Sequence, residues 1–484
     1  MRASSLALWL AVAPALVGCG TGCDGERAQK TTAPRPGTTD AVIQPGTSSD
    51  TQAAFGNLDA PAGTLDPLFV SLAAAERGDP TGRTLLLFFG DSHTAGDSMT
   101  SRLRVMLQHQ FGDAGRGLVG PGKPPVHHYY QRDVRYGRSG TWTGSVGGHH
   151  GDTEPFGVAG LRVSGQKKGA QLWVETCAEC QAGTSTAQFE ILYYAAPDHG
   201  LLRYRVDEGA WQTLATKTAA IEPPHPARQV IPVEDGPHKL TLEHGGGGAL
   251  DLFGVVMERG KPGVIVDSLG VVGRRLGSLR SWDWSIIGEQ LATRDPKLVV
   301  LQYGTNEADD PDLVLEDMAK YYDETIQRIR AAAPMAAILI LGPPDMAVRE
   351  AGKACDRMKP PKGNVDAGVV TECEWRTPAI LREIIAVEHA AAVRNHVAFF
   401  DTFSAMGGAD QMHAWVIAEP RVAFKDHVHL TDIGYGRWAD SLSGALLEDY
   451  GRWRRANGLA PSKPVTPLPS TPKGADPLPG TAAP

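Results

Sequence analysis

Three polar stretches contain the residue types that nucleophilic catalysis at a carbonyl group needs. Ser92 directly follows the apolar run 84–89, Asn306 follows a second apolar run, and Asp426 precedes His429 by three residues. A serine nucleophile requires a base within hydrogen-bond reach, a group that orients the base, and donors for the developing oxyanion. The sequence therefore offers each part of such a site next to a predicted strand or helix.

Each of these residues also has a purely structural interpretation. Asp91 or Ser92 can cap the helix that follows, Gly273 can serve a tight turn, and Asn306 can bind local backbone. Taken together, these interpretations do not explain why Asp426 and His429 occur where a base is needed. A spacing of three suits a short turn, on which the carboxylate accepts from one imidazole nitrogen while the other nitrogen faces the serine.

Other histidines are also candidates for the catalytic base or for a metal site. His427 is the alternative base, but alternation along the turn points it away from the side that His429 occupies. His93 is interpreted as a structural or site-wall residue. The pairs 127–128 and 149–150 suggest a metal, but neighbouring histidines usually point apart, so we expect surface residues and no metal site.

Short apolar runs, bounded by Gly, Pro or Asp, predict buried parallel strands, and helical periodicity fills most of the gaps between them. One stripe from Val314 to Ile329 recurs at steps of three or four over about five turns. The pattern predicts a three-layer α/β/α sandwich with a parallel sheet. In such sheets, functional side chains gather at the carboxyl ends of the strands. The predicted strands are 84–89, 263–267, 297–303, 336–341 and 397–401.

The alternation of strands and helices stops at about Ser145 and resumes after Arg259. Between them lie β-type runs separated by Gly, Pro and Asp, which predict an inserted all-β module of the two-sheet, jelly-roll kind. We interpret the four glycines 245–248 as a hairpin tip and not as a phosphate loop, because no helix follows them.

The chain begins with one early positive charge, an apolar run from Leu6 to Val17, and small residues before Cys19. This run is short for a transmembrane helix and is typical of an export signal. Residues 16–19 resemble the bacterial lipoprotein cleavage box, which implies lipidation of Cys19; the alternative is an ordinary secretory signal. The absence of Asp at Gly20 resembles lipoproteins that are sent to the outer membrane.

Both ends of the chain are rich in Pro, Thr, Gly, Ser and Ala, so we expect flexible segments there. The expected organisation is a signal peptide (1–18), a tether (19–62), the first part of the α/β domain (63–144), the β-rich insert (145–259), the second part of the α/β domain (260–455), and a Pro-rich tail (456–484).

An oxidising compartment makes disulfides the first interpretation of the cysteines. Cys355 and Cys373 bracket a Pro/Gly/Lys-rich loop and are the candidate loop-closing disulfide. Cys177 and Cys180 have redox-motif spacing but lie among β-type residues, which favours a local disulfide or inert thiols over redox catalysis. Zinc is disfavoured because no second cysteine pair with matching spacing occurs.

Composition excludes several classes of protein. With 42% hydrophobic and 21% charged residues, the chain is globular and not disordered. The formal net charge of −8 gives no basic footprint, so we expect no nucleic-acid partner. The oligomeric state is not predicted by any of these features.

The order and placement of four motifs resemble the SGNH/GDSL hydrolase family. They are Gly-Asp-Ser-His at 90–93, the stretch 267–273, Tyr-Gly-Thr-Asn-Glu at 303–307, and the stretch 424–431. Because these motifs recur in this order at strand ends, the resemblance implies the flavodoxin-like sandwich of that family and a serine esterase without metal or organic cofactor.

Carried over by position, the resemblance also implies a role for each site residue. Ser92 is the nucleophile, and Asp426 and His429 complete the triad as orienter and base. The oxyanion donors are the backbone N–H groups of Ser92 and Gly273 and the side-chain amide of Asn306. The resemblance covers residues 83 to 455.

A finer resemblance involves the stretch 90–97, the motif at 303–307, and residues 405–408 with Trp415. These are similar to an envelope branch that includes peptidoglycan O-acetylesterases, in which a carbohydrate-binding-module-like β domain is inserted between the first two motifs. The resemblance implies that an acyl-enzyme removes O-acetyl groups from peptidoglycan or another envelope polysaccharide. The loop 343–375 is the candidate wall of the acyl pocket.

Three alternatives stay open. The same triad serves lipases and thioesterases, and it serves O-acetyltransferases, in which a sugar hydroxyl replaces water in the second step. The alternative from another class is a glycan-binding envelope lipoprotein that keeps an inactive hydrolase scaffold.

Overall fold

The computed structural model describes residues 57–148, 154–350 and 374–462. All of them belong to one compact unit, Ser48–Pro484. The predicted signal peptide, Cys19, most of the tether, and the cysteines 355 and 373 lie outside the described residues, as does most of the Pro-rich tail.

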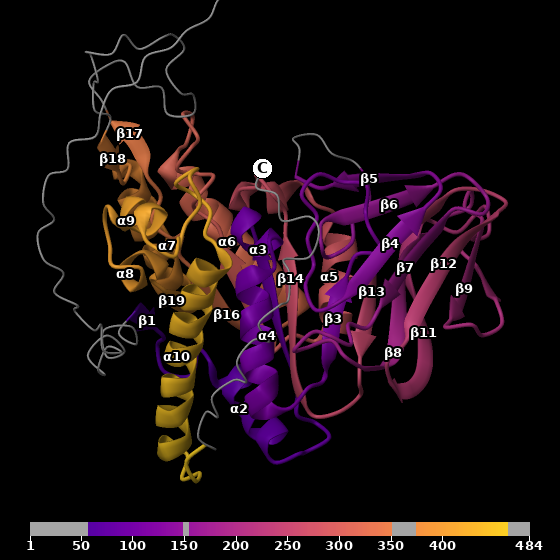
Figure 1. The fold of residues 1–484 in the computed structure, drawn as a ribbon, viewed down its shortest axis with the longest axis horizontal. Coiled ribbons are helices and arrows are strands. Elements are labelled where there is room, and N and C mark those ends of the chain that lie inside the picture. The colour runs from indigo at the N-terminus through magenta and orange to yellow at the C-terminus, as the bar shows by residue number, and fades with distance from the viewer. Residues whose placement is uncertain (1–56, 149–153, 351–373, 463–484) are drawn as a thin grey trace, which may run out of the picture. The chain divides into compact units, whose positions relative to one another are not determined.

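A six-stranded sheet forms the centre of the α/β part of the chain (Figure 1). Its order is β1-β19-β16-β15-β2-β14, and every neighbouring pair is parallel except β1 with β19. All five predicted apolar runs form strands of this sheet, which confirms the parallel-sheet prediction. The strands are β1 (Leu58–Asp59), β2 (Arg83–Gly90), β14 (Gly263–Gly270), β15 (Leu298–Gln302), β16 (Ala337–Leu341) and β19 (Ala398–Phe400).

Helices cover both faces of this sheet. The side chains of β2 alternate between the two faces, and each face packs in an apolar cluster with a different set of helices. Leu85 and Phe89 pack in a cluster with residues of α5 (Trp284–Arg294), α6 (Leu315–Ala332) and α7 (Ala379–Asn395). Leu86 and Phe88 pack in a second cluster with residues of α2 (Asp66–Glu76), α4 (Ser98–Phe111) and α10 (Asp432–Ala456). The result is the three-layer sandwich that the sequence predicts.

The segment between β2 and β14 forms two further sheets that share one apolar core. One sheet has the order β10-β9-β12-β7-β4, and the other has the order β11-β8-β13-β6-β5 with β3 paired to β13. Leu172 and Leu242 of the first sheet pack in the same cluster as Val163 and Ile191 of the second. This is a β-sandwich, and its strands include residues that precede Ser145. The strands are β3 (Gly115–Val119), β4 (Arg135–Ser139), β5 (Trp142–Val146), β6 (Leu161–Gly165), β7 (Gln171–Glu175), β8 (Thr186–Ala195), β9 (Leu201–Val206), β10 (Gln212–Ala215), β11 (His225–Gly236), β12 (Lys239–Gly246) and β13 (Leu250–Glu258).

The glycines 245–248 do not form the hairpin tip that we predicted. They join β12 to β13, which belong to different sheets. A Cβ at Gly248 would lie 2.3 Å from the backbone oxygen of Asp198, so only glycine fits this close approach.

The β-sandwich packs directly on the α/β part. Phe253 of β13 belongs to the same apolar cluster as Leu85 of β2. Arg294 of α5 is buried and forms ion pairs with Glu258 of β13 and with Asp267 of β14, the latter at 2.6 Å. Because both carboxylates meet one guanidinium, these contacts tie β13 to the edge of the parallel sheet.

The remaining elements are short and lie near the carboxyl ends of the strands or after them. They are α3 (Ser92–Ala95), the 3-10 helix η2 (Leu276–Ser281), β17 (Val348–Glu350), β18 (Glu374–Arg376), α8 (Thr402–Ala405) and α9 (Gln411–Ile417). Within the described ranges, every helix is too short or too polar to span a membrane.

Candidate active site

Ser92 lies where β2 ends and α3 begins. Asp91 takes the capping role, because its Oδ1 accepts a hydrogen bond from the His93 N–H at 2.8 Å. The Ser92 hydroxyl is thus left for other partners. Gly90 permits the sharp turn: a Cβ there would lie 2.3 Å from Thr94 Oγ1 and 2.9 Å from the backbone oxygen of Gln302.

The structure brings Ser92, His429 and Asp426 together. His429 Nε2 lies 2.8 Å from Ser92 Oγ, and His429 Nδ1 lies 2.7 Å from Asp426 Oδ2. The turn before α10 fixes the carboxylate, because Asp426 Oδ1 accepts from the N–H groups of Val428 and His429, both at 3.0 Å. This chain of contacts lets the imidazole take a proton from the serine while the carboxylate holds its Nδ1 proton.

The electrostatics of the pair favour an imidazole that accepts a proton. Burial lowers the pKa of His429, but the hydrogen bond and the charge of Asp426 outweigh this effect and raise that pKa above its ordinary value. Burial likewise raises the pKa of Asp426, but the hydrogen bond and the charge of His429, together with the N–H groups of Val428 and His429, outweigh burial, so the pKa of Asp426 is lowered. Both shifts stabilise the ion pair that would form after proton transfer.

The other histidines have the structural roles that we expected. His93 is fully buried, its Nδ1 lies 3.0 Å from the Tyr435 hydroxyl, and its ring packs against that of His429. Burial holds the pKa of His93 well below its ordinary value, so it forms a neutral wall behind the base. His127 and His128 are exposed; the pair 149–150 lies outside the described residues.

His427 turns away from Ser92. Its Nε2 lies 2.9 Å from His413 Nδ1, its Nδ1 lies 2.9 Å from the backbone oxygen of Lys425, and its ring stacks on Trp375 with a centroid separation of 3.3 Å. With both ring nitrogens and a ring face engaged, His427 is not placed to act as the base.

Two of the three predicted oxyanion donors, Gly273 and Asn306, lie in the loops after β14 and β15. Gly273 is exposed and has a φ of +73°, a conformation that glycine adopts without strain. The Asn306 side-chain amide donates to the backbone oxygen of Arg274 at 2.9 Å. An amide carries two N–H groups, so one remains to donate to an oxyanion. β2, which ends just before Ser92, lies between β14 and β15 in the sheet.

Two buried carboxyl groups near the site, Glu307 and Asp91, were given no part in catalysis by the sequence analysis. Glu307 accepts from the N–H groups of Leu276 and Gly304, at 2.8 and 2.9 Å, and so joins the two loops. Burial, together with the nearby Glu307, raises the pKa of Asp91 to about 7. Both residues adjoin a predicted site residue in sequence, which is the only signal that marked them.

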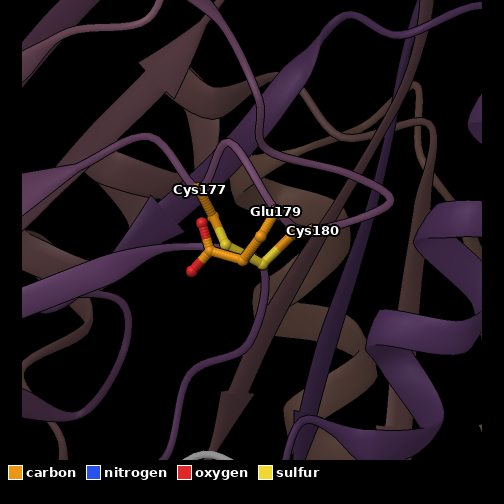
Figure 2. Close-up of side chains that lie close together, drawn as sticks. All are labelled: Cys177, Glu179 and Cys180. Atoms are coloured by element: carbon orange, nitrogen blue, oxygen red, sulfur yellow. A yellow bond between two sulfur atoms is a disulfide. The ribbon is translucent and has the colours of Figure 1, made fainter. Parts of the chain in front are cut away.

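The Cys177–Cys180 pair forms a disulfide, one of the two outcomes that we favoured over redox catalysis. Figure 2 shows the joined sulfur atoms next to Glu179. Within the described part of the chain, these three residues are the only cluster with metal-ligating atoms close together. It does not suit a metal, because the sulfurs are bonded to each other and Glu179 pairs with Arg135 at 2.7 Å.

Comparison with known proteins gives a family match and a fold match. Residues 237–437, which include Gly273, Asn306, Asp426 and His429, match the GDSL-like Lipase/Acylhydrolase family model. The solved structure titled "Peptidoglycan O-acetylesterase in action, 5 min" is 24% identical to this chain, with a TM-score of 0.64. The similarity covers 82% of this chain and 99% of that one, and it establishes a shared fold.

More distant structures also match. An acetyl xylan esterase is 16% identical, with a TM-score of 0.26; the similarity covers 38% of this chain and 80% of the esterase chain. A family two carbohydrate esterase from Cellvibrio japonicus is 10% identical, with a TM-score of 0.23; the similarity covers 69% of this chain and 98% of that esterase chain. None of the curated proteins matches the chain.

Proposed function

Because residues 237–437 match the GDSL-like Lipase/Acylhydrolase family model, we propose that the chain is a serine esterase that removes O-acetyl groups from peptidoglycan or another envelope polysaccharide. One observation carries the proposal: the Ser92 hydroxyl, the His429 imidazole and the Asp426 carboxylate form a continuous chain of contacts of 2.8 and 2.7 Å. This is the arrangement that an acyl-enzyme mechanism requires.

In the proposed first step, His429 takes the proton of Ser92 as Oγ attacks the acetyl carbonyl. Asp426 stabilises the imidazolium that forms. The negative charge that develops on the carbonyl oxygen is met by the N–H groups of Ser92 and Gly273 and by the Asn306 amide. His429 then gives its proton to the sugar oxygen, which leaves as a hydroxyl.

In the second step, His429 takes a proton from water, and the hydroxide attacks the acetyl group on Ser92. The tetrahedral intermediate collapses, Ser92 regains its proton from His429, and acetate leaves. A sugar hydroxyl in place of water would give transfer in place of hydrolysis, so this step separates the esterase from an O-acetyltransferase.

An open site supports a small acyl group on a bulky polymer. The side chains of His429 and Asp426 are 32% and 38% exposed, and Gly273 is exposed as well. The β-sandwich borders the same loop, because Arg274 Nε donates to the backbone oxygen of Gly147 at 2.9 Å. A polymer chain at Ser92 would thus lie within reach of both parts of the molecule.

The test is acetate release from O-acetylated peptidoglycan and from short and long 4-nitrophenyl esters, by a chain that lacks residues 1–22 and by its Ser92→Ala variant. The proposal expects the parent to release acetate from peptidoglycan and the variant to release none. Hydrolysis of short esters alone would move the substrate to another polymer, and preference for long esters would favour a lipase. A folded but inactive parent would contradict the esterase.

We also propose that lipidation of Cys19 anchors the chain to the bacterial outer membrane. A membrane tether would keep the esterase close to the wall and raise its effective concentration at the polymer. The test is the fractionation of cells that express the full chain or its Cys19→Ala variant. The proposal expects the full chain in the outer-membrane fraction and the variant outside it; equal distribution would contradict it.

A further inference from the structure

Gly273 and Asn306, the two predicted oxyanion donors outside Ser92, lie in loops after strands that do not pair with each other. We call these two loops the oxyanion arms. Gly273 follows β14 and Asn306 follows β15, and each of these strands pairs with β2 on opposite sides. Sheet hydrogen bonds therefore fix each arm relative to Ser92 but do not link the arms to each other. An oxyanion site needs its donors at a set separation, so other contacts must hold the two loops together.

Arg275 makes such a link. Its Nε donates to the backbone oxygen of Asn306 at 3.2 Å, and its Nη1 forms an ion pair with Asp310. The neighbouring Arg274 carbonyl receives the Asn306 side-chain amide at 2.9 Å. One guanidinium thus joins the residues that follow Gly273 to both the start and the end of the segment 306–310.

We propose that Arg275 is a positioning residue of the oxyanion site, which sets the separation between the Gly273 N–H and the Asn306 amide. This inference rests on the proposed function, because it assumes that these donors meet an ester oxyanion. Arg275 touches neither the ester nor Ser92. It acts through Asn306, whose backbone it holds while the side chain divides its two N–H groups between Arg274 and the oxyanion.

Because Arg275 is partly exposed, its effect on the rate can be distinguished from an effect on the stability of the fold. Its side chain is 43% exposed and that of Asp310 is 17% exposed. Ion pairs near the surface contribute little to the free energy of unfolding. Loss of Arg275 should therefore reduce the rate much more than the stability.

Arg280 provides a matched control. It lies on η2, just after Arg275, its side chain is also 43% exposed, and it pairs with Glu324 at 2.9 Å. Arg280→Gln removes the same charge from the same segment without touching Asn306 or Asp310. Asp310→Asn removes the charge of the second partner of Arg275. It is the alternative test of the same link if Arg275→Gln folds poorly.

The experiment measures kcat and KM on 4-nitrophenyl acetate for the parent and for Arg275→Gln, Asp310→Asn and Arg280→Gln. We expect Arg275→Gln to lower kcat by about ten- to a hundredfold with little change in KM, as for a displaced catalytic group. Asp310→Asn should act in the same direction, and Arg280→Gln should match the parent. The pH at which the rate is half-maximal should not move, because His429 is untouched.

A double-mutant cycle tests whether Arg275 acts through Asn306. In an Asn306→Ala background, Arg275→Gln should lower kcat by about twofold at most, because the group that it positions is gone. Full additivity, or Arg275→Gln and Asp310→Asn with the same kcat as Arg280→Gln, would overturn the inference.

The small ester keeps this result distinct from the substrate question. A parent that cleaves 4-nitrophenyl acetate but not peptidoglycan would overturn the proposed substrate while the comparison of variants still decides the role of Arg275. A folded parent that cleaves neither would overturn both proposals together.

Discussion

His429 lies between Ser92 and Asp426, with its Nε2 at 2.8 Å from the serine hydroxyl and its Nδ1 at 2.7 Å from the carboxylate. The two contacts fix which nitrogen carries the proton: Nδ1 donates to Asp426, so the neutral ring presents the Nε2 lone pair to Ser92. The contribution of Asp426 can therefore be separated from that of the base itself.

Asp426→Asn should keep the turn but lose the orientation of the base. The asparagine oxygen can still accept from the Val428 and His429 N–H groups, while its NH2 group then faces His429 Nδ1 and favours the wrong tautomer. We expect kcat on 4-nitrophenyl acetate to fall by about 10³- to 10⁴-fold. Circular dichroism and the melting temperature check that the fold is kept; a loss smaller than tenfold would contradict the role of Asp426.

The rate should rise with pH on the acidic side. The base must be neutral, and Asp426 raises the pKa of His429 above its ordinary value of 6.5. The acidic limb of kcat/KM should therefore lie above pH 6.5 and follow one ionisation. Its midpoint is read from a pH series on 4-nitrophenyl acetate, with an exposed-residue variant such as Arg280→Gln as control. A midpoint below 6.5 would show that another group controls the rate.

His427 should matter for stability and not for the acidic limb. His427→Ala removes the contact to His413 and the stacking on Trp375, which hold the turn between Asp426 and His429. We expect a loss of about 1–3 kcal/mol in the free energy of unfolding, measured by urea denaturation. Residual activity should show the parent's pH midpoint. Complete loss of activity in a folded variant would instead support His427 as the base.

The sequence predicted the sandwich because its strands are continuous apolar runs that end in polar motifs. The run 84–89 is buried on both faces, so its type and limits can be read directly. The position of β2 between β14 and β15 is a matter of long-range pairing, which local pattern does not encode. For this reason the sequence named Gly273 and Asn306 as donors but gave no sign that Arg275 and Glu307 join their loops.

The sequence also left open whether Asp91 or Ser92 caps the helix α3. Asp91 and Ser92 are both good N-cap residues, so composition alone did not distinguish them. The structure assigns the cap to Asp91, whose Oδ1 meets the His93 N–H. The glycines 245–248 were misassigned for a related reason: a run of glycines marks a sharp connection but does not reveal which sheets it connects.

Asp91 should make the fold less stable as pH rises toward neutrality. Its carboxyl group is fully buried, and burial is the main cause that raises its pKa from 3.8 to about 7. A carboxyl group with a raised pKa favours the folded state most below its unfolded pKa. This contribution is lost progressively as pH rises from about 4 to about 7, and the ceiling on the loss is about 4 kcal/mol.

Asp91→Asn tests this because asparagine can keep the cap while staying neutral. Its side-chain oxygen can still accept from the His93 N–H, so the start of α3 should be unchanged. We expect the variant to unfold at a higher urea concentration than the parent at pH 8 and at a similar one at pH 4. The charge of Asp91 also helps to raise the pKa of His429, so the acidic limb of the variant should shift to lower pH. Equal stability of parent and variant at both pH values would show that the pKa of Asp91 is not raised in the folded chain and would contradict the prediction.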